Sequence, residues 1–404
     1  MSKLLTPVSE ALEHLLGSIV PLGEITLVPI EEACGLVLAR EQCAAIDVPT
    51  YDNSAMDGYL INTADLNNDS AVLPVSQTIA AGHPGSPLVR GTVARIFTGA
   101  PIASGGNAVV MQENVASVAG GIRILEQPIA GQNIRLRGHD LSAGSVVLRA
   151  GHRLQAQDIG LLASLGISRV EVFRPLTVAI INTGDEVVAP GNPLAPGQLY
   201  DSNSFMLAAL LQKLGLHVLK LGIVEDTLEA TEAALQKAAD TADCLITTGG
   251  VSVGEADYVR EAVTRLGSLT LWKLAIKPGK PFSYGQIAGR PFFGLPGNPV
   301  AVFVTFLMLV RPALLKMQGA TEKNIRTFPA RAGFSIASTG TRQEYLRVIL
   351  SKGESEIPVA TPFNDQGSSL MSSLTWADGL LVVPAGRAVE SGQVLEYLPF
   401  YGLL

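Results

Sequence analysis

Four glycine-containing segments of the sequence combine turn residues with groups that can bind an anion. They are Thr183-Gly184-Asp185-Glu186, Thr247-Thr248-Gly249-Gly250-Val251-Ser252, Lys277-Pro278-Gly279-Lys280-Pro281 and Leu295-Pro296-Gly297-Asn298-Pro299. Each lies next to an apolar run that predicts a strand, and ligands of open α/β sheets bind outside the carboxyl ends of the strands. Together the segments predict a site for an anionic ligand at one sheet edge. The alternative is that their glycines only close tight turns.

Two of these segments also predict the start of a helix. Gly249 and Gly250 would let the backbone approach a ligand closely, and Ser252 extends the loop beyond what a turn requires. Asn298 is predicted to be the N-cap of a helix whose first residue is Pro299. Because the first N–H groups of a helix have no partner inside the helix, such a terminus favours an anion.

Three lysines fall close together in the same region. Lys273 and Lys277 are four residues apart near the end of a strand predicted from Leu269 to Ile276, so both could face one side of the sheet. Lys280 follows three residues later. Ammonium groups so grouped in an acidic protein predict a site for phosphate or another oxyanion. The alternative is that they are solvated edge lysines, which discourage strand pairing.

The acidic residues allow more than one interpretation. Asp226 precedes a predicted helix with Glu229 three residues later, and this spacing favours an N-cap over catalysis. Asp257 lies in a predicted first helical turn, where the macrodipole favours a carboxylate. Glu186 ends a strand inside the predicted site. The polar segment 52–59 has more side chains able to ligate than a turn needs, although an Asx-type turn is the alternative. Carboxylates beside lysines suit Mg²⁺ held between protein and phosphate oxygens.

Composition excludes several classes of protein. The 404 residues predict about two to four domains at roughly 100–200 residues each. A net charge of −7 and an aromatic content of 5% disfavour nucleic-acid binding. The longest apolar run, from Val300 to Val310, is shorter than the roughly 20 residues of a membrane span. Cys34, Cys43 and Cys244 give neither a full disulfide framework nor a zinc pattern, which predicts reduced, mostly buried thiols and a cytoplasmic protein.

Periodicity predicts the elements that must position these groups. Helices are expected over 7–19 and 154–165, and short strands with Gly/Pro turns over 45–149. Strands and helices alternate over 175–317, which predicts a layered α/β domain with a mostly parallel sheet. Residues 327–404 return to short strands, which is typical of a small barrel or sandwich.

The motifs together resemble the molybdopterin molybdenumtransferases, a family that includes the bacterial MoeA proteins and the E domain of gephyrin. The matching segments are 52–59, Thr98-Gly99-Ala100-Pro101, Thr183-Gly184-Asp185-Glu186, 247–258, 277–281 and 295–299, in that order along the chain. The resemblance covers essentially the whole chain. It implies a multidomain fold of α/β plus β type and an elongated homodimer. The implied domains are a three-layer α/β molybdopterin-binding domain (1–26 and 173–326), a β-rich lobe (47–140), a connecting domain (27–46 and 141–172) and a C-terminal small β-barrel (327–404).

The resemblance also implies the chemistry and the residues that perform it. The expected reaction inserts molybdenum from molybdate into adenylylated molybdopterin with Mg²⁺ and releases AMP, at a site between the α/β domain of one subunit and the lobe of the other. The implied catalytic residues are Asp57, Thr98, Asp140, Glu186, Asp226, Asp257, Lys273 and Lys277, of which Asp57, Asp140 and Glu186 are the metal candidates. The implied substrate-binding residues are Gly249, Gly250, Ser252, Gly279, Lys280, Pro296, Gly297, Asn298, Pro299, Arg347, Ser368 and Ser369.

Two features separate the chain from related adenylyltransferases, which share the α/β domain. Those enzymes read Thr-Thr-Gly-Gly-Thr-Gly, whereas Gly250 is followed here by Val251 and Ser252, and no second α/β domain is present. The alternatives to a molybdenum insertase are a gephyrin-type non-catalytic dimeric scaffold and a molybdopterin adenylyltransferase. The adenylyltransferase of the same pathway is a candidate partner, and no nucleic acid or membrane is expected.

Overall fold

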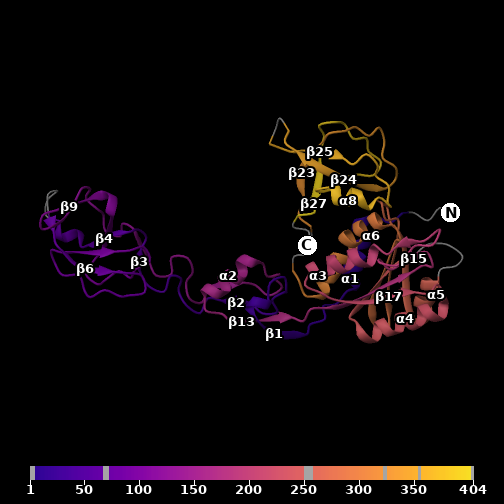
Figure 1. Ribbon diagram of the computed structural model, residues 1–404, viewed down its shortest axis with the longest axis horizontal. Helices are drawn as coiled ribbons and strands as arrows, with labels where there is room; N and C mark the ends of the chain where they lie inside the picture. Colours follow the sequence, from indigo (N-terminus) through magenta and orange to yellow (C-terminus); the bar gives the residue numbers. More distant parts are fainter. Residues whose placement is uncertain (1–4, 67–71, 250–257, 322–324, 354–355, 402–404) are drawn as a thin grey trace. The chain divides into compact units, whose positions relative to one another are not determined.

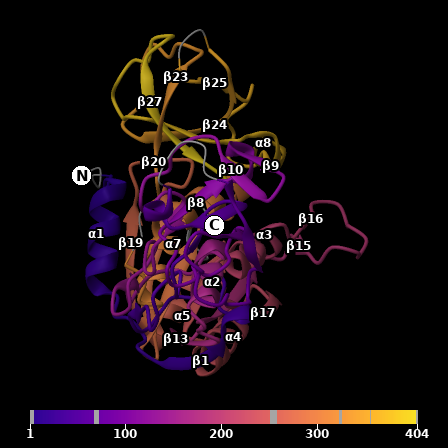
Figure 2. The same cartoon turned by 90° about the vertical axis from the view of Figure 1, so that its left-hand side faces the viewer.

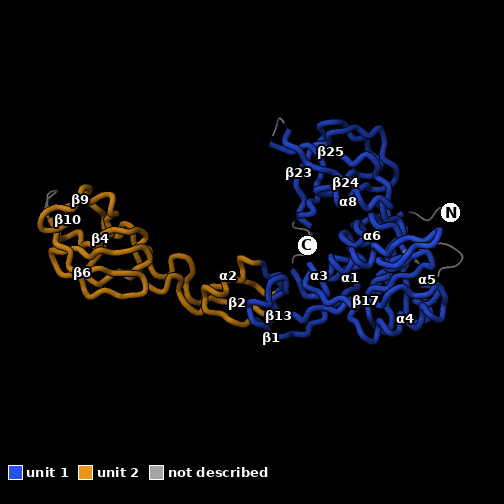
Figure 3. The backbone as a smooth tube through the Cα atoms, viewed as in Figure 1, with its two compact units in different colours: residues 1–39, 151–155, 170–404 blue, residues 40–150, 156–169 orange. Residues whose placement is uncertain are grey.

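The computed structural model describes residues 5–66, 72–249, 258–321, 325–353 and 356–401 of the chain. Two compact units divide it (Figure 3). Unit 1 contains Met1–Ala39, Gly151–Gln155 and Val170–Leu404, and unit 2 contains Arg40–Ala150 and Ala156–Arg169. The element order is shown in Figure 1. Each unit is described by itself.

A six-stranded sheet forms the centre of unit 1. Its strands, in spatial order, are β17 (His217–Val224), β14 (Thr177–Thr183), β18 (Cys244–Thr248), β22 (Arg290–Leu295), β21 (Pro281–Ile287) and β19 (Gly267–Lys273). The first four are parallel to one another, but β21 pairs antiparallel with both β22 and β19. Because β19 is antiparallel to β21, it runs in the same direction as the first four strands. The sheet is therefore mixed but mostly parallel, as predicted, and β21, which was not predicted, is its antiparallel strand. The β21–β22 hairpin turns at Ala288 and Gly289, both with positive φ.

Helices cover both faces of this sheet, so the predicted three layers are confirmed. On one face lie α1 (Val8–Ser18), α3 (Asn203–Lys213) and a long helix made of α6 (Pro299–Thr305), a π-helical turn (Phe306–Val310) and α7 (Arg311–Met317). On the other face lie α4 (Leu228–Thr241) and α5 (Tyr258–Leu266). Helices can cover both faces because the strands are apolar on both sides. In β14, Val178 and Ile180 belong to one hydrophobic cluster, and Ala179 and Ile181 belong to the other.

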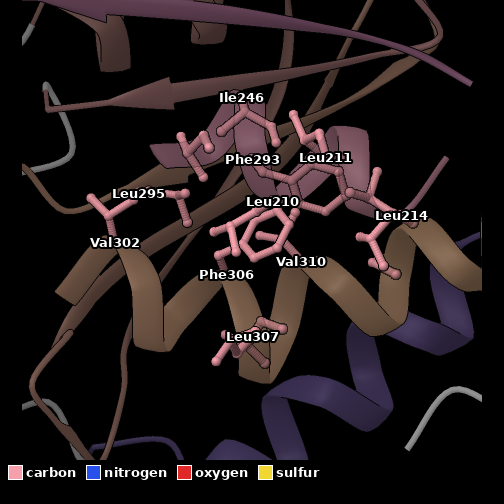
Figure 4. Packing of buried hydrophobic residues seen from close by; sticks show 14 of the residues in the cluster. Leu210, Leu211, Leu214, Ile246, Phe293, Leu295, Val302, Phe306, Leu307 and Val310 are labelled. Atoms are coloured by element: carbon pink, nitrogen blue, oxygen red, sulfur yellow. The ribbon is translucent and has the colours of Figure 1, made fainter. Parts of the chain in front are cut away.

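The long helix is the core of the first face. Phe306 and Val310 pack among Leu210, Leu214 and Phe293 (Figure 4). The stretch Pro299–Met317 is long and apolar enough to cross a membrane, but 89% of it is buried inside the protein. It is therefore a core helix, which is apolar on all sides because other helices and the sheet surround it.

The C-terminal part of unit 1 is a small β-barrel, as predicted. Its strands are β23 (Phe328–Ala332), β24 (Gln343–Ser351), β25 (Val359–Pro362), β26 (Gly379–Val383) and β27 (Val394–Pro399), with α8 (Met371–Trp376). The order β24-β25-β23-β27-β26 closes because β26 pairs back to β24. A short strand, β20 (Ile276–Lys277), joins the barrel by pairing with β24, and it lies between the barrel and β19 (Figure 2). Unit 1 also contains the pairs β1 (Ile25–Pro29) with β13 (Arg169–Phe173) and β15 (Val187–Val188) with β16 (Leu199–Tyr200).

Unit 2 is rich in short strands, which confirms the predicted β texture. A four-stranded sheet contains β6 (Val75–Ile79), β7 (Val93–Ile96), β4 (Gly58–Ile61) and β8 (Ala108–Met111). A three-stranded sheet contains β5 (Val72–Leu73), β10 (Gly121–Ile124) and β9 (Val115–Val118). The remaining elements are the pairs β11 (Ile134–Arg135) with β3 (Asn53–Ser54) and β12 (Val146–Leu148) with β2 (Gln42–Cys43), and helix α2 (Ala156–Ser164).

The three cysteines are free, in agreement with the sequence interpretation. Cys244 is buried in β18, whereas Cys34 and Cys43 are exposed. The expectation of mostly buried thiols is therefore wrong for two of the three.

Candidate active site

The predicted glycine-rich segments meet at one edge of the central sheet. Strands β14, β18 and β22 are parallel and in register there, with Asn182 paired to Thr248 and Thr248 to Leu295. Because β21 is antiparallel, its first residue lies at the same edge. A cavity of about 600 Å³ opens at this edge. Its lining residues are Gly249, Lys277, Pro278, Gly279, Lys280, Pro281, Pro296, Gly297, Asn298, Ala301, Arg342, Gln366, Gly367 and Ser368.

The segment 277–281 carries the chain from the barrel into the central sheet. Lys277 belongs to β20, and Pro281 is the first residue of β21. Between them the Lys277–Pro278 bond is cis, and Gly279 has φ +114°, a conformation that favours glycine. Lys273 ends β19 in the central sheet, so the expectation that Lys273 and Lys277 share one strand is wrong. Lys277 and Lys280 line the cavity, whereas Lys273 does not.

The start of the long helix forms a second wall. Asn298 occupies the N-cap position as predicted, but its side chain does not cap the helix and instead donates to Ser368 Oγ at 2.9 Å. The Val300 N–H donates to the Ser368 carbonyl at 3.0 Å. Asn203, at the start of α3, donates to the Gly297 carbonyl at 2.7 Å. These bonds hold segment 296–299 in place. The N-terminus of the long helix, which has a partial positive charge, therefore lies at the cavity and favours an anion.

The third wall comes from the barrel, and sequence reasoning found only part of it. Ser368 was predicted, but Arg342 and Gln366 were missed. Arg342 precedes β24 and makes no hydrogen bond or ion pair with any residue that the structure describes. The sequence signal that could have indicated Arg342 is a positively charged residue within the predicted C-terminal β region, but no motif or spacing distinguishes it from other arginines. Ser369 is exposed and is not part of the lining.

Arg347 shapes this wall from behind. Its side chain is fully buried on β24, and it donates to the Gly367 carbonyl at 2.9 Å and to Ser373 Oγ at 3.0 Å. Burial lowers the pKa of its guanidinium. Gln366 is held in turn, because its Oε1 accepts from the Arg347 N–H at 2.9 Å. Arg347 therefore fixes the segment that lines the cavity and does not itself line it.

The charge of the cavity follows from this lining. Of the described residues that form it, Lys277, Lys280 and Arg342 are cationic and none carries a carboxylate. Ammonium and guanidinium groups beside a helix N-terminus can hold a doubly charged oxyanion. The geometry therefore fits an oxyanion, and the volume leaves room for part of a larger ligand.

Three carboxylates lie together at the adjoining ends of β14 and β17. Burial raises the pKa of Asp226, and the nearby charges of Asp185 and Glu186 raise it further. Asp226 is not the N-cap of α4 as its spacing suggested, because Thr227 takes that position and its side chain accepts from the Ala230 N–H at 3.3 Å. Three predicted site residues, Gly250, Ser252 and Asp257, lie outside the described residues.

In unit 2, the predicted pair Asp57 and Thr98 is in direct contact. Asp57 Oδ1 accepts from the Thr98 N–H at 2.7 Å and from its hydroxyl at 2.8 Å. The hydrogen bonds from Thr98, with a smaller contribution from the charge of Arg95, lower the pKa of Asp57. This carboxylate is therefore ionised and oriented at neutral pH. Asp140 is exposed, and its N–H donates to the Val48 carbonyl at 2.9 Å.

A magnesium site made only of protein ligands is not formed within the described part of the chain. No group of three or more His, Cys, Asp or Glu side chains there has an arrangement that could hold a metal. Mg²⁺ in phosphate-handling enzymes takes one or two carboxylates and completes its shell with substrate oxygens and water. Asp226, whose charge is disfavoured by its two acidic neighbours, fits that role because a cation would relieve the repulsion.

Comparison with known proteins covers nearly the whole chain. Residues 6–166 match the MoeA N-terminal region (domain I and II), residues 179–316 a probable molybdopterin binding domain, and residues 329–400 the MoeA C-terminal region (domain IV). The molybdopterin molybdenumtransferase of Haemophilus influenzae is 40% identical over 382 residues, which are 93% of this chain and 94% of that protein. The Nostoc enzyme of the same name is 36% identical, covering 91% of this chain and 87% of that one. The crystal structure of the molybdopterin biosynthesis MoeA protein from Pyrococcus horikoshii aligns with a TM-score of 0.83 at 31% identity, over 98% of this chain and all of that one.

Proposed function

The chain belongs to the MoeA family of molybdopterin molybdenumtransferases, and on this premise we propose that it inserts molybdenum from molybdate into adenylylated molybdopterin, with Mg²⁺, and releases AMP. The observation that carries the proposal is the cavity of about 600 Å³ whose charged lining residues are all cations. Molybdate is a tetrahedral dianion, and such a lining stabilises it by charge-assisted hydrogen bonds.

Each cavity wall has a defined task in this reaction. Lys280 and Arg342 bind molybdate oxygens, and the fixed helix start at Asn298 supplies a positive backbone end. Arg347 keeps the barrel wall in position through Gly367. Molybdate is thereby oriented before the pterin arrives, which removes part of the entropic barrier to the transfer.

The acidic residues would act on the phosphate groups of the adenylylated substrate. Asp226 and Glu186 would hold Mg²⁺, and phosphate oxygens of the substrate would complete its shell. The ion supplies Lewis-acid stabilisation of the charge that develops when the phosphoanhydride breaks. Asp57, kept ionised by Thr98, would position the water or the metal. Asp140 and Asp257 are further candidates from the family resemblance, as are Lys273 and the loop residues Gly250 and Ser252.

We propose that the enzyme is a cytoplasmic homodimer in which the Asp57 segment of one subunit completes the pocket of the other. Two further proposals accompany this one: the four-domain division given above, and delivery of the substrate by the pathway's adenylyltransferase. Light scattering of the purified protein measures the subunit count, and a monomer at micromolar concentration would contradict a shared site. Mixing Asp57→Ala subunits with Lys280→Gln subunits provides a stronger test, because only a shared site would restore activity in the mixed dimer.

The reaction itself is tested by AMP release from adenylylated molybdopterin on addition of molybdate and Mg²⁺. We expect AMP to be released only when both are present, and Lys280→Gln to lose most of the activity. Lys237→Gln, which removes an exposed lysine from α4, is the matched control and should behave as the wild type. Substrate binding without AMP release would favour the scaffold alternative, and consumption of ATP with molybdopterin would favour the adenylyltransferase.

A further inference from the structure

One lysine of the cavity differs from the other two cations. Lys277 Nζ donates to Glu344 Oε1 at 3.1 Å, and the Glu344 side chain is only 12% exposed. Lys280 and Arg342 have no hydrogen bond or ion pair to any residue described in the structure. Glu344 is not itself a lining residue. The cavity thus carries a carboxylate immediately behind one of its three cations.

The pairing of two strands creates this arrangement. In the parallel ladder between β20 and β24, Lys277 is the direct partner of Glu344, 67 positions away in the sequence. Ile276 pairs in the same way with Gln343. The backbone pairing therefore places the two residues side by side, and the Glu344 carboxylate lies next to the Lys277 ammonium group.

A fixed carboxylate at this position opposes anion binding. It attracts the Lys277 ammonium group and repels any negative charge in the cavity, and its low exposure weakens solvent screening of both effects. Lys277 without Glu344 would offer its full charge to the anion. The net charge of the cavity region is lower by one unit than the lining alone indicates.

We propose that Glu344 sets the charge of the oxyanion pocket, so that a tetrahedral dianion is bound loosely enough to leave the pocket during transfer. The proposal rests on the proposed function, because it assumes that an oxyanion occupies this cavity. Glu344 is a positioning residue in this scheme, since it acts on the anion through Lys277 and through space. A pocket with three uncompensated cations would retain molybdate and slow its transfer to the pterin.

If Glu344 acts through its charge, the effect of replacing it must depend on the charge of the bound anion, whereas a purely structural role of Glu344 predicts no such dependence. The Coulomb energy between Glu344 and the anion is proportional to the charge of the anion. Glu344→Gln keeps the shape and can still accept from Lys277, but removes the negative charge. We expect it to tighten molybdate binding about tenfold, or ~1.4 kcal/mol. Perrhenate is a tetrahedral oxyanion with a single charge, so its binding should tighten only about threefold, the square root of the molybdate effect.

The experiment is calorimetric titration of the full-length protein with molybdate and with perrhenate. Wild type, Glu344→Gln, Glu344→Asp and Glu396→Gln are compared. Glu396 is an exposed carboxylate on β27 of the same barrel, and its replacement removes the same charge away from the cavity, so no change is expected. Glu344→Asp retains the charge and should stay within about twofold of the wild type.

A double-mutant cycle keeps the test informative if Glu344→Gln folds poorly. Lys277→Gln leaves Glu344 uncompensated and should bind molybdate most weakly, whereas Lys277→Gln combined with Glu344→Gln should recover several-fold in affinity. Equal or weaker molybdate binding by Glu344→Gln, or equal effects on both anions, overturns the charge-setting role. Absence of molybdate binding by the wild type would instead contradict the proposed function itself.

Discussion

Gly279 offers the sharpest test of how the cavity is built. It is buried at the turn between the barrel and the central sheet, with φ +114°. A Cβ atom at this position would lie 2.5 Å from Thr305 Cγ2 of α6. Gly279→Ala therefore introduces two separable costs, one in the backbone and one in packing.

The two costs give the expected magnitude. A non-glycine residue in a sparsely populated backbone region costs about 1–3 kcal/mol. Overpacking by one methyl group in a buried site costs a further ~1–3 kcal/mol. We expect Gly279→Ala to lower the free energy of unfolding by about 2–6 kcal/mol, measured by urea denaturation, and to weaken molybdate binding because the turn carries Lys277 and Lys280.

A second substitution separates packing from backbone strain. Thr305→Ser removes the opposing methyl group but keeps the hydroxyl that donates to the Ala301 carbonyl at 2.7 Å. Added to Gly279→Ala, it should recover the packing part and leave the backbone part. Gly297→Ala is the matched control, since its Cβ would meet only Gly249 Cα at 4.0 Å and its φ is not positive. Stability of Gly279→Ala within ~1 kcal/mol of the wild type, or no recovery by Thr305→Ser, would refute the reasoning.

Three more predictions address the charged groups. Arg342→Gln should weaken molybdate binding about tenfold and reduce its salt dependence, and unchanged calorimetry at two ionic strengths would remove Arg342 from the site. Thr98→Val removes a hydroxyl donor, so the pKa of Asp57 should rise and the acid limb of the rate–pH profile should move to higher pH; an unmoved limb would show that Asp57 does not control it. Asp243→Asn should cost about 2–4 kcal/mol of stability, because Asp243 is buried and accepts two hydrogen bonds from Arg174. Burial raises the pKa of Asp243, but these bonds lower it below its usual value overall. The stability that Asp243 contributes is therefore present above the pKa of the unfolded state and is lost as the pH falls through the folded pKa. If the difference in urea midpoint between the wild type and Asp243→Asn were the same at pH 7 and pH 3, this prediction would be wrong.

The sequence predicted the elements with strong patterns. Helices α1 and α2 lie within the predicted ranges 7–19 and 154–165, because α1 has clear periodicity and Gly166 follows the end of α2. Strand β21 was missed because Ser283 and Gly285 interrupt its apolar residues and a Lys-Pro-Gly-Lys-Pro turn precedes it. Consequently the antiparallel pairing of β21 with β22 and β19 could not be predicted.

Local spacing also misassigned the helix cap at Asp226. The pattern of Asp226 and Glu229 fits a capping box, yet Thr227 accepts the capping bond, since a shift of one residue leaves the sequence signature almost unchanged. The family resemblance implied that Arg347 binds substrate; in the structure it is buried and donates to the Gly367 carbonyl, and a direct contact with substrate stays a prediction. Burial of a charged residue has no sequence signature, because its partners are carbonyl groups that every residue carries.

The chemistry of the cavity depends most on the contact that sequence reveals least. Strand β20 has two residues, too few for any periodicity, and it was assigned to the end of the preceding strand. Its pairing with β24 nevertheless places Glu344 behind Lys277 and brings the barrel residues Arg342 and Gln366 to the sheet edge. This pairing joins residues 67 positions apart, so no local pattern in the sequence indicates it. The positive rim can therefore be predicted from the lysines and the glycine turns, whereas its net charge requires the structure.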